Sequence, residues 1–302
     1  MEGGKNYPDD TSEKAAEIRE LLRDTRFRKA LSIGFDRQRF ADVIWSGFGT
    51  SMQAGLSPQA WHYASPEGQA ILKQWQQADI ELDPEKANAY LDEIGFVDKN
   101  GDDWRDLPSG KDFELVIDFH DWGGSAKIQA DAAAEMENQW ETNLKLQVRP
   151  NNMLGSPDLQ TRRTSGQLMV LGGAIAGVDE WTFPGSTFGI WGDWHFALES
   201  QWYNSGGKQG VQPLPGSPAE KLQALYTQGL QEPDINKRHE IIWEAIKVNI
   251  EEGPFVIGTV GNQPAPAILK NYMRNVLDFG VTGPWSPNEP NNQVPAQWWI
   301  DK

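Results

Sequence analysis

The pattern that most constrains the fold is a strand, a long helix and a second strand between residues 113 and 148. Residues 113–119 (FELVIDF) alternate toward a strand, residues 125–144 have helical periodicity, and residues 144–148 (LKLQV) form a second strand candidate. Strand, crossover helix and strand make a βαβ unit, so we expect a parallel pair with a right-handed crossover. Residues 167–171 and 255–260 add two further strand candidates. The sequence therefore predicts an α/β protein.

Helices are expected on both sides of this unit. Acidic and hydroxyl N-cap residues precede apolar positions at helical spacing, and Gly95 ends one of these segments. The expected helices begin near residues 12, 24, 36, 83, 217 and 236. Residues 172–216 are rich in Gly and Trp and are predicted to be one long loop.

Charge and composition exclude several classes of protein. The 302 residues carry 43 acidic and 27 basic side chains, for a formal net charge of −16. Binding to nucleic acid is disfavoured, because phosphate contacts need Lys and Arg. The absence of Cys excludes disulfides, thiolate metal sites and cysteine nucleophiles. No apolar stretch approaches the roughly 18–20 residues that span a bilayer, and the first residues do not resemble a signal peptide.

A search for catalytic groups finds little. Acidic pairs such as Asp179-Glu180 are numerous, and nothing selects one of them as the two carboxylates of a glycosidase. The segment from Asp98 to Asp102 begins like a calcium loop but lacks its Gly and closing Glu, which favours a polar turn. The four His residues lack metal-ligand spacing. We therefore predict no catalytic residue, metal site or cofactor, and favour a binding protein over an enzyme.

The segment richest in aromatic residues runs from residue 181 to residue 203. Its aromatic residues are separated by Gly, Pro, Ser, Thr and Asp instead of helix-forming residues, which favours a wall presented to a ligand. The opposite interpretation, in which the segment folds its own aromatic side chains inward, has equal weight for any single Trp. The candidates for stacking or apolar contact are Trp181, Trp191, Trp194, Trp202 and Tyr203.

Five motifs, in order, resemble the family 5 extracellular solute-binding proteins of ABC importers, the receptors for peptides, nickel and oligosaccharides. The first is the signature of residues 24–37 (DTRFRKALSIGFDR), in which Gly34 stands where Ala is usual. The others are residues 47–50 (GFGT) with Pro58, residues 83–96 (DPEKANAYLDEIGF), residues 98–111 (DKNGDDWRDLPSGK) and residues 202–208 (WYNSGGK).

The resemblance implies a type II periplasmic-binding-protein fold, represented mostly by one lobe with a mixed sheet flanked by helices. Family members are longer, so we expect this chain to be a fragment. Residues 1–23 are then a helical lead-in from the missing first lobe, residues 24–268 the second α/β lobe, and residues 269–302 a segment returning to the first lobe. Trp285, Trp298 and Trp299 in that segment are expected to lack their burial partner, so the isolated chain is predicted to be marginally stable or to self-associate.

The resemblance also implies a function. The chain is expected to belong to the substrate-binding component of an ABC importer, which captures an oligopeptide or oligosaccharide by two-lobe hinge closure and delivers it to membrane permease subunits. Location is then periplasmic or extracellular, with membrane association of the full-length protein. Asp179 is the candidate polar contact, although residues 177–181 depart from the family's ligand-amine motif. A carbohydrate-active enzyme and a stand-alone carbohydrate-binding module remain alternatives.

Overall fold

The computed structural model describes residues 13–53, 58, 60–121, 125–173, 179–191, 195–262, 269–276 and 297–301. The helices are α1 Glu13–Arg23, α2 Thr25–Ile33, α3 Arg37–Trp45, η1 Trp61–Tyr63, α4 Pro66–Gln77, α5 Pro84–Glu93, α6 Ala126–Leu144, α7 Ser156–Thr164, α8 Gly185–Phe188, α9 Ala197–Asn204, α10 Pro218–Gln231 and α11 Ile235–Glu252. The strands are β1 Thr50–Ser51, β2 Leu115–Phe119, β3 Val148–Asn152, β4 Val170–Leu171, β5 Val260–Gly261, β6 Met273–Arg274 and β7 Trp299–Ile300.

The predicted βαβ unit is present as β2, α6 and β3. β2 pairs in parallel with β3 on one side and with β4 on the other, which gives the strand order β3-β2-β4. The expected strand at 144–148 is wrong in its position, because β3 begins at Val148. Lys145 ends α6 in the left-handed conformation (φ 54°), and the residues after it connect the end of the helix to the start of β3. The α/β fold class is confirmed.

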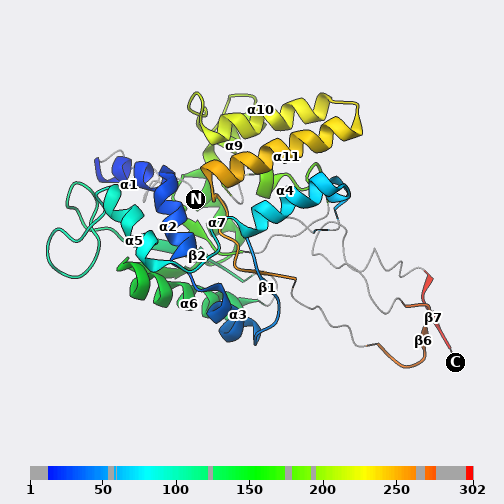
Figure 1. Cartoon of the computed structure of the whole chain (residues 1–302), viewed down its shortest axis with the longest axis horizontal. Helices are drawn as coiled ribbons and strands as arrows, with labels where there is room; N and C mark the ends of the chain where they lie inside the picture. The colour runs from blue at the N-terminus through cyan, green and yellow to red at the C-terminus, as the bar shows by residue number, and fades with distance from the viewer. Residues whose placement is uncertain are drawn as a thin grey trace.

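A first core surrounds this sheet. Helices α1, α2, α5 and α6 pack with the strands and bury a continuous apolar cluster, and Figure 1 shows α6 along one side of the sheet region and α1, α2 and α5 at its end. Phe27 of α2 meets Phe96 and Phe113 edge to face, at ring-centroid distances of 5.8 and 6.2 Å. Trp140 of α6 is fully buried, and its indole N–H donates to the Leu31 carbonyl at 2.9 Å. Trp140 is therefore part of the first core.

A second core lies between α4, α8, α10 and α11. Helices α10 and α11 form a long antiparallel pair above α4 (Figure 1), and their apolar faces share one cluster with η1 and α8. Ser217 and Asp234 cap these two helices by accepting hydrogen bonds from backbone N–H groups of the first turn. Both helices were predicted from their caps and periodicity, and their first residues agree with the expected starts to within a residue.

Two expectations about irregular regions are wrong. Residues 255–260 are not a full strand, because Arg37 and Gln53 side chains bind the backbone of Gly258 and only β5 pairs, with β1. Residues 172–216 are not one loop, because they include α8 and α9. The hydroxyl of Ser200 in α9 donates to the Gly189 carbonyl at 2.6 Å, a contact between two parts of the segment that periodicity alone does not reveal.

The last described residues form a separate antiparallel pair, β6 with β7, which lies away from the helices near the C-terminus (Figure 1). Tyr272, Trp299 and Ile300 expose 42%, 53% and 57% of their surface there. Across the ranges that the structure describes, no helix is both long and apolar enough to cross a bilayer.

Candidate functional site

The carboxyl ends of the three parallel strands meet at one edge of the sheet. In the register of β2, Asp118 lies opposite both Asn151 of β3 and Leu171 of β4. The N–H of Gly172, directly after β4, donates to the Asp118 carbonyl at 2.8 Å. In open α/β sheets, ligands bind in the crevice outside the carboxyl ends of the strands. This edge, which we call the sheet edge, is therefore the first place to look for a binding site.

A buried carboxylate holds the strand ends together. Asp118 has no exposed surface, and its two oxygens accept from Asn151 Nδ2 at 2.6 Å and Arg162 Nη2 at 3.0 Å. Burial raises the pKa of Asp118 above its usual value, against the lowering effect of both partners. The carboxylate thus joins β2, β3 and α7, and its role is to fix the sheet edge rather than to meet a solute.

The segments that follow the strands at the sheet edge carry polar side chains that are able to contact a solute. His120 and Asp121 follow β2; His120 is 2% exposed, whereas Asp121 is exposed. Asp121 Oδ1 accepts from the Ser125 N–H at 2.7 Å and so fixes the start of the path into α6. Asp179 is the next described residue after Gly173, beyond β4, and it is half-buried.

Asp179 and Glu180 are adjacent, but their side chains have different surroundings. Asp179 Oδ1 accepts from the Trp181 N–H at 2.9 Å, which stabilises the turn and leaves the carboxylate partly exposed. Glu180 is fully buried; its oxygens accept from Tyr63 Oη at 2.9 Å and from the Thr187 hydroxyl. Burial, first of all, raises the pKa of Glu180 to about 7. Asp179 is therefore the acid of this pair that can reach a solute.

A buried hydrogen bond to His62 fixes the same turn. Its Nε2 accepts from the Glu180 N–H at 3.1 Å, and its carbonyl accepts from Trp243 Nε1 at 3.0 Å. Burial lowers the pKa of His62 to about 3, so the imidazole stays neutral at ordinary pH. The turn that carries Asp179 is thus attached to η1 and α11 through buried polar contacts.

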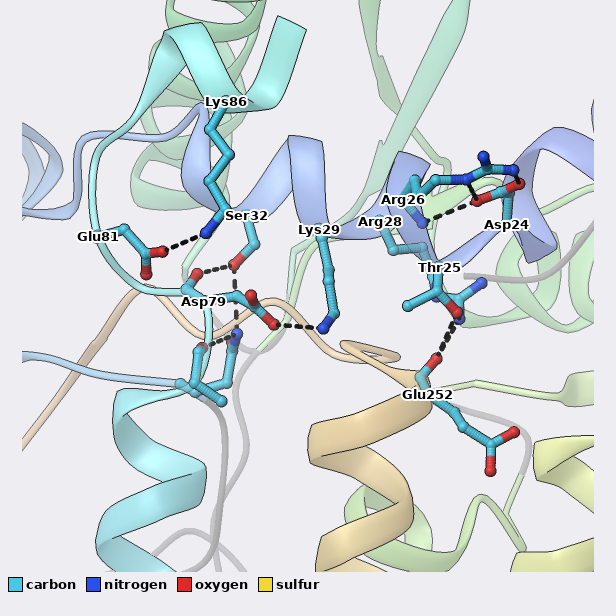
Figure 2. A network of polar contacts seen from close by, with 12 residues as sticks. Asp24, Thr25, Arg26, Arg28, Lys29, Ser32, Asp79, Glu81, Lys86 and Glu252 are labelled. Atoms are coloured by element: carbon cyan, nitrogen blue, oxygen red, sulfur yellow. Dashed lines mark hydrogen bonds and ion pairs between the residues drawn. The ribbon is translucent and has the colours of Figure 1, made fainter. Parts of the chain in front are cut away.

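The signature at residues 24–37 is a structural clamp. Arg28 donates to the carbonyl of Glu252, at the end of α11, and the Thr25 hydroxyl donates to the same oxygen at 3.2 Å. Figure 2 shows this contact beside a second group of polar residues around Ser32, whose hydroxyl donates to the Asp79 carbonyl at 2.6 Å. Arg37 donates to the Gly258 carbonyl at 2.9 Å. These contacts join the first core to the second.

Gly34, the one residue that departs from the usual signature, has a local explanation. A Cβ at this position would lie 2.6 Å from Leu144 Cδ2 and 2.9 Å from the Ala30 carbonyl oxygen. Leu144 is fully buried at the end of α6. The close approach of α6 to the end of α2 thus explains a residue without a side chain here.

The aromatic candidates are distributed among three places. Trp181 is only 9% exposed and stacks on Phe188 and Tyr226, which also contact each other, with the Arg238 guanidinium 4.8 Å from its ring centroid. It packs in the second core, and its predicted ligand contact stays a prediction. Trp194 lies outside the described residues.

The other aromatic candidates line two surface hollows on either side of α9. Trp191, 41% exposed, lines a hollow of about 510 Å³ between α7 and α9, which we call the α7–α9 hollow. Trp202 and Tyr203 line a hollow of about 520 Å³ against α10, the α9–α10 hollow. The four described aromatic candidates therefore do not form one continuous wall.

Asp118 and Glu180 were missed as organising residues. An ionisable residue inside an apolar strand was the available signal for Asp118, since burial of a carboxylate demands partners. Glu180 had no such signal, because it does not lie in an apolar strand and its partner Tyr63 is 117 residues away in the sequence. No group of three or more His, Asp or Glu side chains suited to a metal occurs among the described residues.

Comparisons with known proteins agree with this architecture. A family model described as "Bacterial extracellular solute-binding proteins, family 5 Middle" matches residues 9–195. A solved oligopeptide-binding protein OppA superposes with a TM-score of 0.74 and 26% identity, covering 99% of this chain and 46% of that protein. The oligopeptide-binding protein AppA of Bacillus subtilis (strain 168) is 28% identical over 123 residues, which is 41% of this chain and 20% of AppA.

A third similar protein was solved with a bound ligand. The periplasmic binding protein MelB of Agrobacterium fabrum C58, solved in complex with stachyose, has a TM-score of 0.60 and 18% identity, covering 86% of this chain and 36% of MelB. The chain therefore spans less than half the length of each of these three proteins.

Proposed function

The chain belongs to the bacterial extracellular solute-binding proteins of family 5, and from this premise we propose that it is the lobe of an ABC-importer receptor that captures an oligopeptide. The matched residues 9–195 span the whole sheet edge. The two proteins compared above with at least 26% identity are both named as oligopeptide-binding proteins. We further propose that capture occurs by hinge closure against a second lobe, outside the membrane, and that the bound peptide passes to permease subunits.

The fixed geometry of the sheet edge is the observation that supports the proposal. The buried Asp118 carboxylate joins β2 to β3 and α7, and the Gly172 N–H joins the end of β4 to the Asp118 carbonyl. The chain continues from β2 and β4 into residues 120–125 and 172–179. A rigid edge, with the exposed Asp121 directly beyond β2, provides the preorganised surface that solute binding needs. Asp121 gives this surface negative charge, which suits the α-amino group of a peptide, and Asp179 adds a second acid on the turn that His62 attaches to η1 and α11.

Asp179 is the proposed contact to that amino group. Its carboxylate is half-buried, so the local dielectric is lower than in water and attraction to a cation is stronger. Its hydrogen bond to the Trp181 N–H fixes its position. The aromatic candidates Trp191, Trp202 and Tyr203 are proposed to contact a ligand from the hollows beside α9, and Trp181 from its place beneath the turn.

The substitution Asp179→Asn tests this function. Asn keeps an oxygen that accepts from the Trp181 N–H, so the turn is retained while the charge is removed. We expect the affinity for oligopeptides with a free α-amino group to fall by about tenfold or more in calorimetry, as loss of a partly desolvated charge pair predicts. The affinity for N-acetylated peptides is expected to stay the same.

Asp102→Asn is the matched control. Asp102 lies in the turn at residues 98–105, where its oxygen accepts from the Trp104 N–H at 2.9 Å, so the same charge is removed from a similar turn. Equal losses in the two variants, or an equal loss for acetylated and free peptides, would contradict the assignment. If neither substitution changes peptide binding, the proposed function stands but the proposed role of Asp179 is wrong.

A further inference from the structure

The α9–α10 hollow extends along three turns of α10. The residues of α10 that line it run from Glu220 to Gln231, a distance of about 16 Å along the helix at 1.5 Å per residue. Trp202 and Tyr203 of α9 and Pro213 of the connecting segment line it from the other side. Its volume of about 520 Å³ is in the usual range for small-molecule sites. The hollow is therefore elongated, and it lies beside α9 and α10 rather than at the sheet edge.

A chain of hydrogen bonds fixes α9 against α10 at this hollow. Tyr203 Oη and Thr227 Oγ1 are 2.8 Å apart. The Thr227 hydroxyl donates to the Gln223 carbonyl at 2.8 Å, so the Tyr203 hydroxyl is the donor of the first contact. Gln223 Nε2 donates in turn to the Glu199 carbonyl of α9 at 3.0 Å. The two helices are thus already in place, and a ligand does not have to order them.

Polar groups in the hollow are available to a ligand. Gln223 is only 5% exposed and its amide nitrogen is paired, whereas its oxygen accepts from no described residue. The Tyr203 hydroxyl donates once and keeps its lone pairs. The side chains of Gln228 and Gln231 are exposed and make no hydrogen bond within the described part of the chain. The hollow thus offers acceptors at fixed positions and amides that can both donate and accept.

Trp202 supplies an aromatic surface beside these groups. Its side chain is half-buried. A Cβ at Gly207 would lie 3.5, 3.7 and 3.8 Å from three atoms of the indole, so the Gly207 backbone packs against the ring. The Gly207 N–H donates to the Trp202 carbonyl at 2.8 Å, which fixes this packing. An indole that is held in place and partly exposed is suited to stack on the C–H face of a sugar ring.

A neutral, hydroxylated ligand fits this set of groups better than an anion or a proline-rich peptide. Sugar hydroxyls both donate and accept, so they can pair with the fixed acceptors and with the amides. A proline-rich peptide could pack on Trp202 and Pro213, but proline has no N–H to donate to the acceptors. The Glu220 carboxylate accepts from the Gly216 N–H at 2.7 Å, and its charge at one end of the hollow disfavours an anionic ligand.

We propose that the α9–α10 hollow is a second binding site, for a short neutral oligosaccharide. One sugar ring stacks on Trp202, and its hydroxyls donate to Gln223 Oε1 and Tyr203 Oη. The next ring pairs with the amides of Gln228 and Gln231. Peptide capture at the sheet edge is a separate event, so either proposal can fail without the other.

The test is calorimetry and saturation-transfer NMR of the chain with maltotriose and cellotriose, and with trigalacturonate as an acidic saccharide. We expect at least one neutral trisaccharide to bind, with the same affinity at low salt and at about 150 mM salt, because its contacts involve no charge pair. Trp202→Ala should weaken binding by about tenfold or more, as loss of a central aromatic contact predicts. Tyr203→Phe and Gln228→Ala should each weaken it severalfold.

Trp61→Ala and Gln74→Ala are the matched controls. Trp61 is 47% exposed on η1 and Gln74 is exposed on α4, and both lie outside the hollow. Both variants should leave the saccharide affinity unchanged. The proposal is overturned if neither neutral trisaccharide binds at millimolar concentration, if trigalacturonate binds more tightly than both, or if Trp61→Ala weakens binding as much as Trp202→Ala. It is also overturned if a proline-rich peptide occupies the hollow and the saccharides do not.

Discussion

Replacement of the buried Glu180 by Gln is predicted to change how stability depends on pH. Glu180 is fully buried, and its two hydrogen-bond donors do not offset the burial that raises its pKa from 4.5 to about 7. Below pH 4.5 the carboxyl is protonated in both the folded and the unfolded chain. Between pH 4.5 and 7 only the unfolded chain releases the proton, so the folded state loses stability as the pH rises. The loss amounts to about 3 kcal/mol near pH 7, at 1.36 kcal/mol per pKa unit.

Gln is the suitable replacement because it has the shape of the protonated acid and never ionises. Its oxygen can accept from Tyr63 and its amide can donate to the Thr187 oxygen. Glu180→Gln should therefore equal the parent chain in stability near pH 4.5 and exceed it by about 3 kcal/mol at pH 8.

The comparison between the two chains is essential, because other buried groups titrate too. The pKa of His62 is lowered to about 3, so His62 destabilises the fold as the pH falls through 6.5, opposite in sign to Glu180. Taking the difference between variant and parent removes this contribution, as long as His62 is unperturbed.

Urea unfolding followed by circular dichroism at pH 5 and pH 8, at constant ionic strength, measures the difference. Glu244→Gln on α11, whose side chain is 57% exposed, is the control and should give the same difference at both pH values. A Glu180→Gln variant whose stability relative to the parent is the same at pH 5 and pH 8, or is lower at pH 8, would refute the reasoning.

Three further predictions concern the clamp, the helix contact and the tail. Arg28→Met should lower the free energy of unfolding by about 2–4 kcal/mol in urea titrations, because the Glu252 carbonyl and its neighbours lose a buried donor; a change below measurement error would contradict the clamp. Gly34→Ala should cost about 1–3 kcal/mol by overpacking against Leu144, and adding Leu144→Val should recover part of that loss; no recovery would count against the contact. Trp299→Ser should increase the monomer fraction in sedimentation velocity, whereas a parent chain that is monomeric with a sharp, high melting transition would rule out self-association through the tail.

The sequence predicted those elements whose signals are local. N-caps and periodicity located α10 and α11, and the βαβ unit followed from alternation on either side of a long helical stretch. The start of β3 was misplaced because LKLQV alternates like a strand, although Lys145 is committed to ending α6. A local pattern of alternation does not reveal that the backbone N–H of a residue such as Lys145 is already bonded to the last turn of a helix.

The candidate site was predictable only in part, since its packing depends on residues far apart in the sequence. Trp181 was selected for its glycine-rich and polar surroundings, yet Tyr226 and Arg238 from α10 and α11 cover its ring. Asp179 and Glu180 are indistinguishable as a pair of acids in the sequence. The contacts of Glu180 with Tyr63, more than a hundred residues earlier, and with Thr187 separate the buried carboxylate from the accessible one.

The most direct test of the central claim is amide-resolved NMR of this chain during titration with short oligopeptides to millimolar concentration. Binding at the sheet edge predicts that the largest shift changes fall on His120, Gly172 and Asp179, with little change at the remote turn around Gly101. Shift changes confined to other surfaces, or no change at any described residue, would contradict peptide capture at the sheet edge.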